Sequence, residues 1–187
     1  PEVEGTMGQF DTSYGGTITL IEDISDVEKL KFCESSKVAF VTQTTLSVDD
    51  TQELKDSLIN KFPDIIGPKK DDICYATQNR QDAVKQLALE SDLVIVIGSE
   101  NSSNSNRLRE IAERSGVKAY LIDSIRDLPA ECLEGKKRIG LTSGASAPEH
   151  LVSEVIDTLT KKYGFKLQGN RTRTDEGISF RLPKGLR

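Results

Sequence analysis

A run of short polar side chains follows an apolar stretch in the middle of the chain, and its composition suits the binding of an anion. The apolar stretch is LVIVI, residues 93–97, and the polar run is SENSSNSN, residues 99–106. Uninterrupted, mostly β-branched residues are typical of a strand buried on both faces of a parallel sheet. Where such a strand leads into a helix, backbone N–H groups and the positive end of the helix dipole point at one place. One helix cap needs one such residue, so seven Ser or Asn in eight positions favour an anion site over a simple capped loop.

Two other stretches of the chain repeat this pattern. Hydroxyl-rich turns at residues 42–45 and 142–146 each follow an apolar run and precede a predicted helix. If the strands are parallel, all three turns lie at the same edge of the sheet. The sequence contains no G-x-x-x-x-G-K-[ST] motif and no G-x-G-x-x-G after a strand. It therefore predicts a phosphate or diphosphate held by neutral donors and helix dipoles.

Cys74 is the residue best placed for thiolate chemistry, either as a nucleophile or as a metal ligand. It stands just before a predicted helix with Thr77 as N-cap, a position that favours the thiolate. Cys33 and Cys132 are interpreted as small buried apolar residues. Without a CxxC pair, the three cysteines predict neither a disulfide scaffold nor a self-contained zinc site, but a reducing, cytoplasmic setting. His150, the only histidine, is predicted at the surface or between helices, so no catalytic triad or His-rich metal site can form.

Composition narrows the classes of partner. The 187 residues are 36% hydrophobic and 29% charged, with a net charge of -5 and no basic stripe, which argues against nucleic acid. No apolar run approaches the roughly 20 residues of a membrane span, and no signal peptide is recognisable. The chain opens at Pro1 in a Gly-rich polar segment without an initiator Met. We expect it to be part of a longer protein.

Strands and helices alternate along the chain, which predicts an α/β fold with parallel sheet. We expect two small units of parallel sheet flanked by helices, the first incomplete at its N-terminus. The polar segment GPKKDD, residues 67–72, separates residues 1–70 from a second unit of residues 71–164, and residues 165–187 form a tail. Residues 1–16 are predicted as loop. The predicted strands are 17–22, 37–43, 65–66, 93–97, 118–122, 138–142 and an edge strand at 178–182; the predicted helices are 26–32, 47–62, 77–91, 104–115 and 148–163.

Five ordered motifs carry a resemblance to a known enzyme family. They are PEVEGTMGQ at 1–9, TQTTLSVDDT at 42–51, DDICYATQNRQ at 71–81, GSENSSNSNRL at 98–108 and TSGASAPEHLV at 142–152. Together they resemble the 4-hydroxy-3-methylbut-2-enyl diphosphate reductases, iron–sulfur enzymes of the non-mevalonate isoprenoid pathway. The resemblance covers nearly the whole chain and corresponds to the later part of those enzymes only.

The resemblance implies roles for particular residues. The family binds a [4Fe-4S] cluster through three cysteines, and Cys74 matches the last of them, so the other two lie outside this chain. Glu2, which its spacing alone would leave as a solvated acid, matches the proton donor. Thr44 matches a substrate contact near the reacting hydroxyl. The diphosphate cradle is matched by Ser102, Ser103, Asn104 and Ser146.

The resemblance also implies a substrate and a partner. The family removes the hydroxyl of an allylic diphosphate reductively, giving isopentenyl and dimethylallyl diphosphates, with electrons from a donor such as ferredoxin or flavodoxin. Its diphosphate pocket also uses histidines that this chain lacks, so we expect the chain alone to be inactive. The alternative is a non-catalytic α/β module that binds a phosphorylated small molecule, with Cys74 merely packed.

Overall fold

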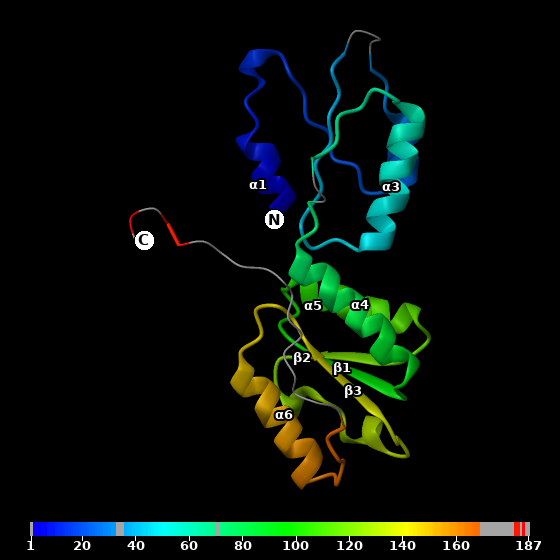
Figure 1. Ribbon diagram of the computed structural model, residues 1–187, viewed down its shortest axis with the longest axis vertical. Helices are drawn as coiled ribbons and strands as arrows, with labels where there is room; N and C mark the ends of the chain where they lie inside the picture. Colours follow the sequence, from blue (N-terminus) through cyan, green and yellow to red (C-terminus); the bar gives the residue numbers. More distant parts are fainter. Residues whose placement is uncertain (1, 33–35, 70–71, 169–181, 184, 186–187) are drawn as a thin grey trace.

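The chain forms two lobes, one above the other in Figure 1. The computed structural model describes residues 2–32, 36–69, 72–168, 182–183 and 185. The N-terminal lobe comprises the described residues up to 69, and the C-terminal lobe comprises residues 72–168. The proposed domain boundary at residues 70–71 falls outside the described ranges.

The C-terminal lobe is built on a three-stranded parallel sheet. Its strands are β1 (Leu93–Ile97), β2 (Ala119–Ile122) and β3 (Ile139–Ser143), in the spatial order β2-β1-β3. The helices are α4 (Tyr75–Leu89), α5 (Ser103–Arg114) and α6 (Glu149–Lys161), with 3-10 turns η2 (Ile125–Asp127) and η3 (Ala130–Leu133). The predicted α/β architecture, a parallel sheet flanked by helices, is thereby confirmed.

The central strand β1 is buried on both faces, as its apolar run predicts. Val94 and Val96 pack on one face against side chains of α4 and α5. Leu93, Ile95 and Ile97 pack on the other face with side chains of α6. Alternate residues of a strand point to opposite sides, so one strand of five residues contributes to both halves of the core.

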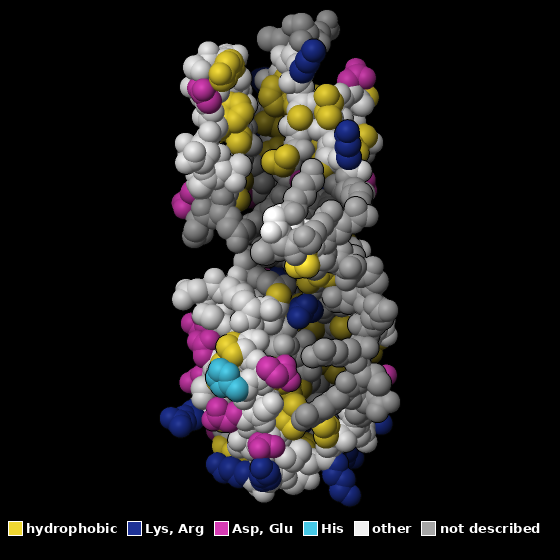
Figure 2. All heavy atoms as spheres, turned by 60° about the vertical axis from the view of Figure 1, so that its left-hand side comes forward, with side chains coloured by type: hydrophobic (Ala, Val, Ile, Leu, Met, Phe, Trp, Pro, Cys, Tyr) yellow, Lys and Arg dark blue, Asp and Glu magenta, His cyan; other side chains and the backbone are white. Residues whose placement is uncertain are grey.

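The N-terminal lobe has little regular sheet. Its elements are α1 (Glu2–Gln9), the 3-10 turn η1 (Thr12–Tyr14), α2 (Ile24–Lys29) and α3 (Val48–Lys61). The strands predicted at 37–43 and 65–66 reduce to a single parallel bridge between Ala39 and Ile66. Figure 2 shows apolar side chains, in yellow, on the surface of this upper lobe.

Several sequence predictions need correction in this lobe. Residues 2–9 were expected as loop but form α1, because glycine costs a helix only about 1 kcal/mol per residue and does not forbid it. Residues 17–22 were expected as a strand, yet they form no ladder within the described ranges. A strand is stable only with a neighbour for its backbone groups.

In the C-terminal tail, the predicted edge strand at 178–182 lies almost wholly outside the described residues.

Helix boundaries follow their capping residues. Ser47 caps α3 as predicted, its hydroxyl accepting the N–H of Asp50 at 3.2 Å. Gly164, at φ 77°, lies beyond the end of α6 as predicted for a left-handed position. Two starts were placed too late. Helix α2 is capped by Asp23 rather than Ser25, and Cys74 itself, not Thr77, is the N-cap of α4.

Candidate functional site

The carboxyl ends of β1 and β3 meet at one place, and α5 begins beside them. Ile97 is paired with Ser143, and the next N–H, that of Gly144, donates to the carbonyl oxygen of Ile97 at 2.9 Å. A β-carbon added to Gly98 would lie 2.3 Å from the hydroxyl oxygen of Ser105, and one added to Gly144 would lie 2.2 Å from it. The first turn of α5 therefore packs directly on bare backbone at both strand ends.

Polar side chains at this edge are buried without an internal partner. Both side-chain polar atoms of Asn104 and the hydroxyl of Ser105 make no hydrogen bond within the described protein. Asn104 is only 6% exposed. An unsatisfied buried polar group costs about 1–3 kcal/mol, so these atoms favour a ligand that would satisfy them. The predicted anion site thus has donors available for binding.

The turn at residues 42–45 reaches the same region by side-chain and backbone contacts. The hydroxyl oxygens of Thr45 and Ser103 lie 2.9 Å apart. The carbonyl oxygen of Thr44 accepts the backbone N–H of Cys74 at 3.0 Å. We expected this turn to share a sheet edge with the other two, and that reason is wrong, because residues 37–43 do not join the sheet. Contacts with the starts of α4 and α5, not strand pairing, bring this turn to the sheet edge.

Cys74 presents an exposed thiol at the start of α4. Its carbonyl oxygen accepts the N–H groups of Thr77 and Gln78 at 2.8 and 3.0 Å, so the protein uses its backbone groups and leaves the sulfur accessible. Just upstream, the carboxylate of Asp72 accepts the N–H of Thr42 at 2.8 Å. No group of three or more His, Cys, Asp or Glu side chains is placed to hold a metal within the described ranges. Cys74 is therefore a single candidate ligand.

The remaining predicted site residues differ in their contacts and in how fully the structure describes them. Ser102 caps α5, its hydroxyl accepting the N–H of Ser105 at 3.3 Å, and Ser103 is exposed in the first turn. Ser146 is exposed two residues after Gly144, before α6 begins. Glu2 opens α1 in the N-terminal lobe, but its side chain lies outside what the structure describes.

Cys132 and His150 agree with their predicted structural roles. Cys132 is half-buried against the core on the α6 side of the sheet, and burial raises the pKa of its thiol. His150 is exposed in the first turn of α6. Cys33 lies outside the described residues.

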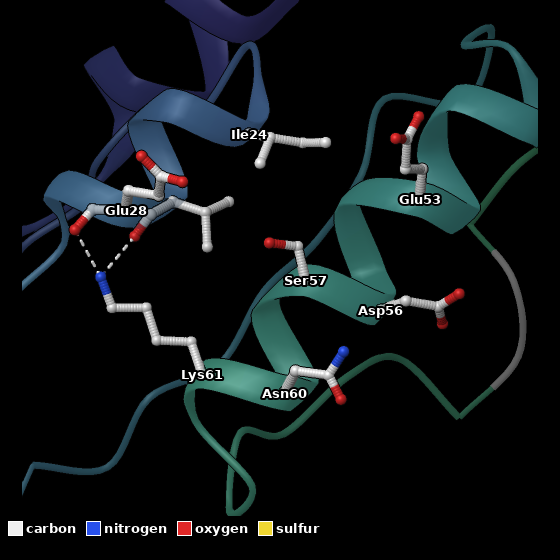
Figure 3. A pocket seen from close by; sticks show the side chains of 8 residues that line it. Ile24, Glu28, Glu53, Asp56, Ser57, Asn60 and Lys61 are labelled. Carbon is white, nitrogen blue, oxygen red and sulfur yellow. Dashed lines mark hydrogen bonds between the residues drawn. The ribbon is translucent and has the colours of Figure 1, made fainter.

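A separate groove lies between α2 and α3 in the N-terminal lobe (Figure 3). The ammonium of Lys61 closes one end by donating to the carbonyl oxygens of Val27 and Glu28 at 2.8 and 2.5 Å. Its walls carry three carboxylates, those of Glu28, Glu53 and Asp56. An acidic groove is a poor match for a diphosphate, and none of the predicted site residues lines it.

The sequence analysis assigned no individual role to two residues near Cys74. Asp72 and Gln81 both hydrogen-bond to the 42–48 segment. Gln81 follows Cys74 by seven residues, about two helical turns, and so lies on the same face of α4. That spacing was the available signal, but a glutamine in a polar helix is usually a solvated residue.

The fold and the site together define the class: an α/β protein that has unpartnered donors at the edge of a parallel sheet, close to an exposed cysteine. The chain belongs to the family of the LytB protein, whose model matches residues 1–160.

Among curated proteins, the chain is 62% identical over 187 residues to the 4-hydroxy-3-methylbut-2-enyl diphosphate reductase of Saccharophagus degradans and 60% identical to that of Alcanivorax borkumensis. Each comparison covers all of this chain and 60% of the relative, so the chain spans about three-fifths of their length. The solved E-1-hydroxy-2-methyl-but-2-enyl-4-diphosphate reductase of Plasmodium falciparum matches 88% of this chain, and 52% of its own, with a TM-score of 0.80 and 37% identity. The family resemblance is confirmed.

No helix in the described parts of the chain has the length and apolar character needed to cross a membrane.

Proposed function

We propose that this chain is the later part of a 4-hydroxy-3-methylbut-2-enyl diphosphate reductase. The reaction breaks the allylic carbon–oxygen bond, consumes two electrons and two protons, and releases water with isopentenyl and dimethylallyl diphosphates. One structural observation carries the proposal. Contacts run from Cys74 through Thr44 and its neighbour Thr45 to Ser103, joining a candidate iron ligand to a candidate diphosphate cradle.

The cradle would bind the diphosphate through neutral donors. The start of α5 carries unpaired backbone N–H groups and several hydroxyls, and the positive end of the helix dipole favours an anion there. The Asn104 amide, buried and without an internal partner, would donate there. Fixing the diphosphate at this end leaves the allylic end to extend toward Thr44 and Cys74. The residues of this cradle are Ser102, Ser103, Asn104 and Ser146.

The iron–sulfur cofactor fits one residue of the described chain. An accessible thiol at a helix N-terminus is a suitable soft ligand, and Cys74 would be one of three. When bound, the [4Fe-4S] cluster supplies the electrons and a Lewis-acidic iron for the hydroxyl. The two other cysteine ligands would come from residues beyond this chain, and Cys132, packed against the opposite face of the sheet, is no substitute.

Two side chains would handle the reacting hydroxyl and its protons. Thr44 is held directly beside Cys74 by their backbone hydrogen bond, so its hydroxyl can orient the substrate oxygen. Glu2 would supply a proton from α1. A ferredoxin or flavodoxin as electron donor and a cytoplasmic location complete the proposal. This chain by itself would be inactive.

The test for the cluster uses the complete protein that contains this chain, prepared without oxygen. We expect the visible iron–sulfur absorption and allylic diphosphate reduction in the parent, and loss of both in Cys74→Ser. Cys132→Ser is the matched control, because that thiol is half-buried elsewhere, and it should keep both. If Cys74→Ser retains the absorption, the assignment of the ligand is wrong.

The test for the cradle measures substrate binding by titration calorimetry in the same protein. Asn104→Ala combined with Ser146→Ala should weaken diphosphate binding at least about tenfold, because hydrogen bonds to a charged ligand are lost. Asn101→Ala, an exposed residue of the same loop, is the control and should bind normally. Diphosphate binding by a protein that never acquires a cluster would support the non-catalytic module instead.

A further inference from the structure

Gln81 is a buried polar residue on α4 whose amide makes two hydrogen bonds to a single turn. Its side chain is 1% exposed. The amide nitrogen donates to the carbonyl oxygen of Leu46 at 2.7 Å, and the amide oxygen accepts the N–H of Val48 at 3.1 Å. The nitrogen must donate and the oxygen must accept, so exchanging the two atoms by rotation of the amide would break both bonds.

These two bonds hold the start of α3. Leu46 and Val48 flank Ser47, the buried N-cap of that helix. The N–H of Val48 belongs to the first turn of α3 and has no acceptor within its own helix. Gln81 supplies that acceptor from a different helix. The approach of α3 to α4 at this point thus depends on a side chain that is far from solvent.

The same turn is also held at its other end by α4. There the N–H of Cys74 donates to the carbonyl oxygen of Thr44 at 3.0 Å. Cys74 and Gln81 are separated by two turns, about 10 Å along the helix axis. Residues 44–48 are therefore hydrogen-bonded to Cys74 at one end and to Gln81 at the other.

The surface ion pair nearby is a weaker restraint. Lys85 of α4 lies 2.8 Å from the carboxylate of Asp49, whose side chain is 69% exposed. Exposed pairs contribute little because water and salt screen them. Gln81, buried and bonded twice, is the stronger link between this turn and α4.

We infer that Gln81 is a positioning residue, one that fixes Thr44 relative to Cys74 without contacting either the substrate or the cofactor. The inference rests on the proposed function, in which Thr44 orients the substrate hydroxyl. It adds a residue to which the sequence motifs assign no role. Removing the amide should allow residues 44–48 to move relative to α4. The resulting loss of activity should come from the displacement of Thr44.

The experiment is a double-mutant cycle in the complete, cluster-loaded enzyme. Gln81→Met keeps the length of the side chain and removes both hydrogen bonds, and it should lower kcat/KM about tenfold. Gln86→Met, an exposed position on the same helix, is the matched control and should leave kcat/KM unchanged. In a Thr44→Ala background the same Gln81→Met change should cost less than about threefold, because the residue on which it acts is gone.

The outcomes separate the role of Gln81 from the proposed function. Equal losses from Gln81→Met in both backgrounds would overturn the inference, because Gln81 would then act on folding alone. So would a Gln81→Met enzyme that matches Gln86→Met. If Gln81→Met does not fold, Gln81→Glu, which keeps the acceptor for Val48 and loses the donor to Leu46, takes its place in the same cycle. An inactive parent enzyme would overturn the proposed function itself.

Discussion

The two lobes are stabilised by different means. In the C-terminal lobe β1 is completely buried and both faces of the sheet are packed. Among the buried apolar side chains of the described residues, only Val27 and Leu58 belong to the N-terminal lobe. That lobe instead exposes most of the large apolar side chains that reach solvent: Phe10, Tyr14, Leu20, Ile24, Phe32, Val41, Ile59 and Ile66.

This difference shows how the candidate site is supported. Burial of apolar surface is the dominant stabilising contribution in folding, and the C-terminal lobe has most of it. Residues from that lobe, such as Asn104, are placed by a packed sheet edge. Thr44, from the other lobe, is placed by hydrogen bonds to α4. One side of the site depends on packing and the other on a few polar contacts.

The largest expected effect comes from one substitution made in both lobes. Val96→Ala, at a fully buried position, should lower the free energy of unfolding by about 2–3 kcal/mol, through lost burial and the cavity left behind. Val41→Ala, at a position 74% exposed, should change it by less than about 0.5 kcal/mol. Urea denaturation followed by circular dichroism measures both. Equal effects would remove the contrast between the lobes.

A second pair of substitutions should have opposite signs in the two lobes. Gly144→Ala places a methyl group against the Ser105 hydroxyl and should destabilise by about 1–3 kcal/mol. Gly5→Ala, in α1 with open space around it, should be neutral or stabilise by up to about 1 kcal/mol through helix propensity. Thermal unfolding of each variant tests the signs.

A rescue experiment identifies the atom responsible for the Gly144 effect. Ser105→Ala removes the clashing oxygen and leaves a carbon at 3.4 Å, so it should restore much of the stability lost in Gly144→Ala. It should not rescue Gly98→Ala, whose added carbon would still lie 2.9 Å from the β-carbon of Ser105. Equal rescue of both would contradict the described packing.

The smallest expected effect concerns the charge contact between the lobes. Asp50 of α3 lies 2.7 Å from Arg114 and 3.5 Å from Arg107, both on α5. Partial burial acts to raise the pKa of Asp50, but hydrogen bonding and the positive charges of the two arginines outweigh it and lower the pKa. The Asp50 side chain is 44% exposed, so solvent screening limits the pair to about 0.5 kcal/mol.

The sign of the pH dependence follows from that lowered pKa. The stabilisation is present above the unfolded-state pKa of about 4 and is lost as pH falls through the lower folded-state value. Asp50→Asn should therefore lose less stability than the parent between pH 7 and pH 2.5. Asp49→Asn, at a side chain 69% exposed, should behave like the parent. Identical pH profiles for the parent and Asp50→Asn would show that the contact contributes nothing.

Local patterns predicted the C-terminal lobe well. The apolar run at 93–97 became a fully buried strand, and the helix between Pro148 and Gly164 was found almost where it was expected. In the N-terminal lobe the helix α3 and its cap were also predicted correctly, but the strands were not. Residues 17–22 have a composition that suits a strand, but they have no strand neighbour in the described protein. Strand propensity is decided by neighbours, which the local sequence does not contain.

The sequence by itself determined which hydrogen-bond donors exist. It also determined that two of the donor-rich turns, those after residues 93–97 and 138–142, follow parallel strands. It also supplied the motifs that assign the family. Only the tertiary structure decided that Thr45 meets Ser103, 58 residues away, and that Gln81 holds the turn carrying Thr44. The physical reason is the distance along the chain over which each kind of interaction acts. Periodicity and capping act over one or two turns of chain, whereas contacts between distant turns are set by how α3, α4 and α5 pack together.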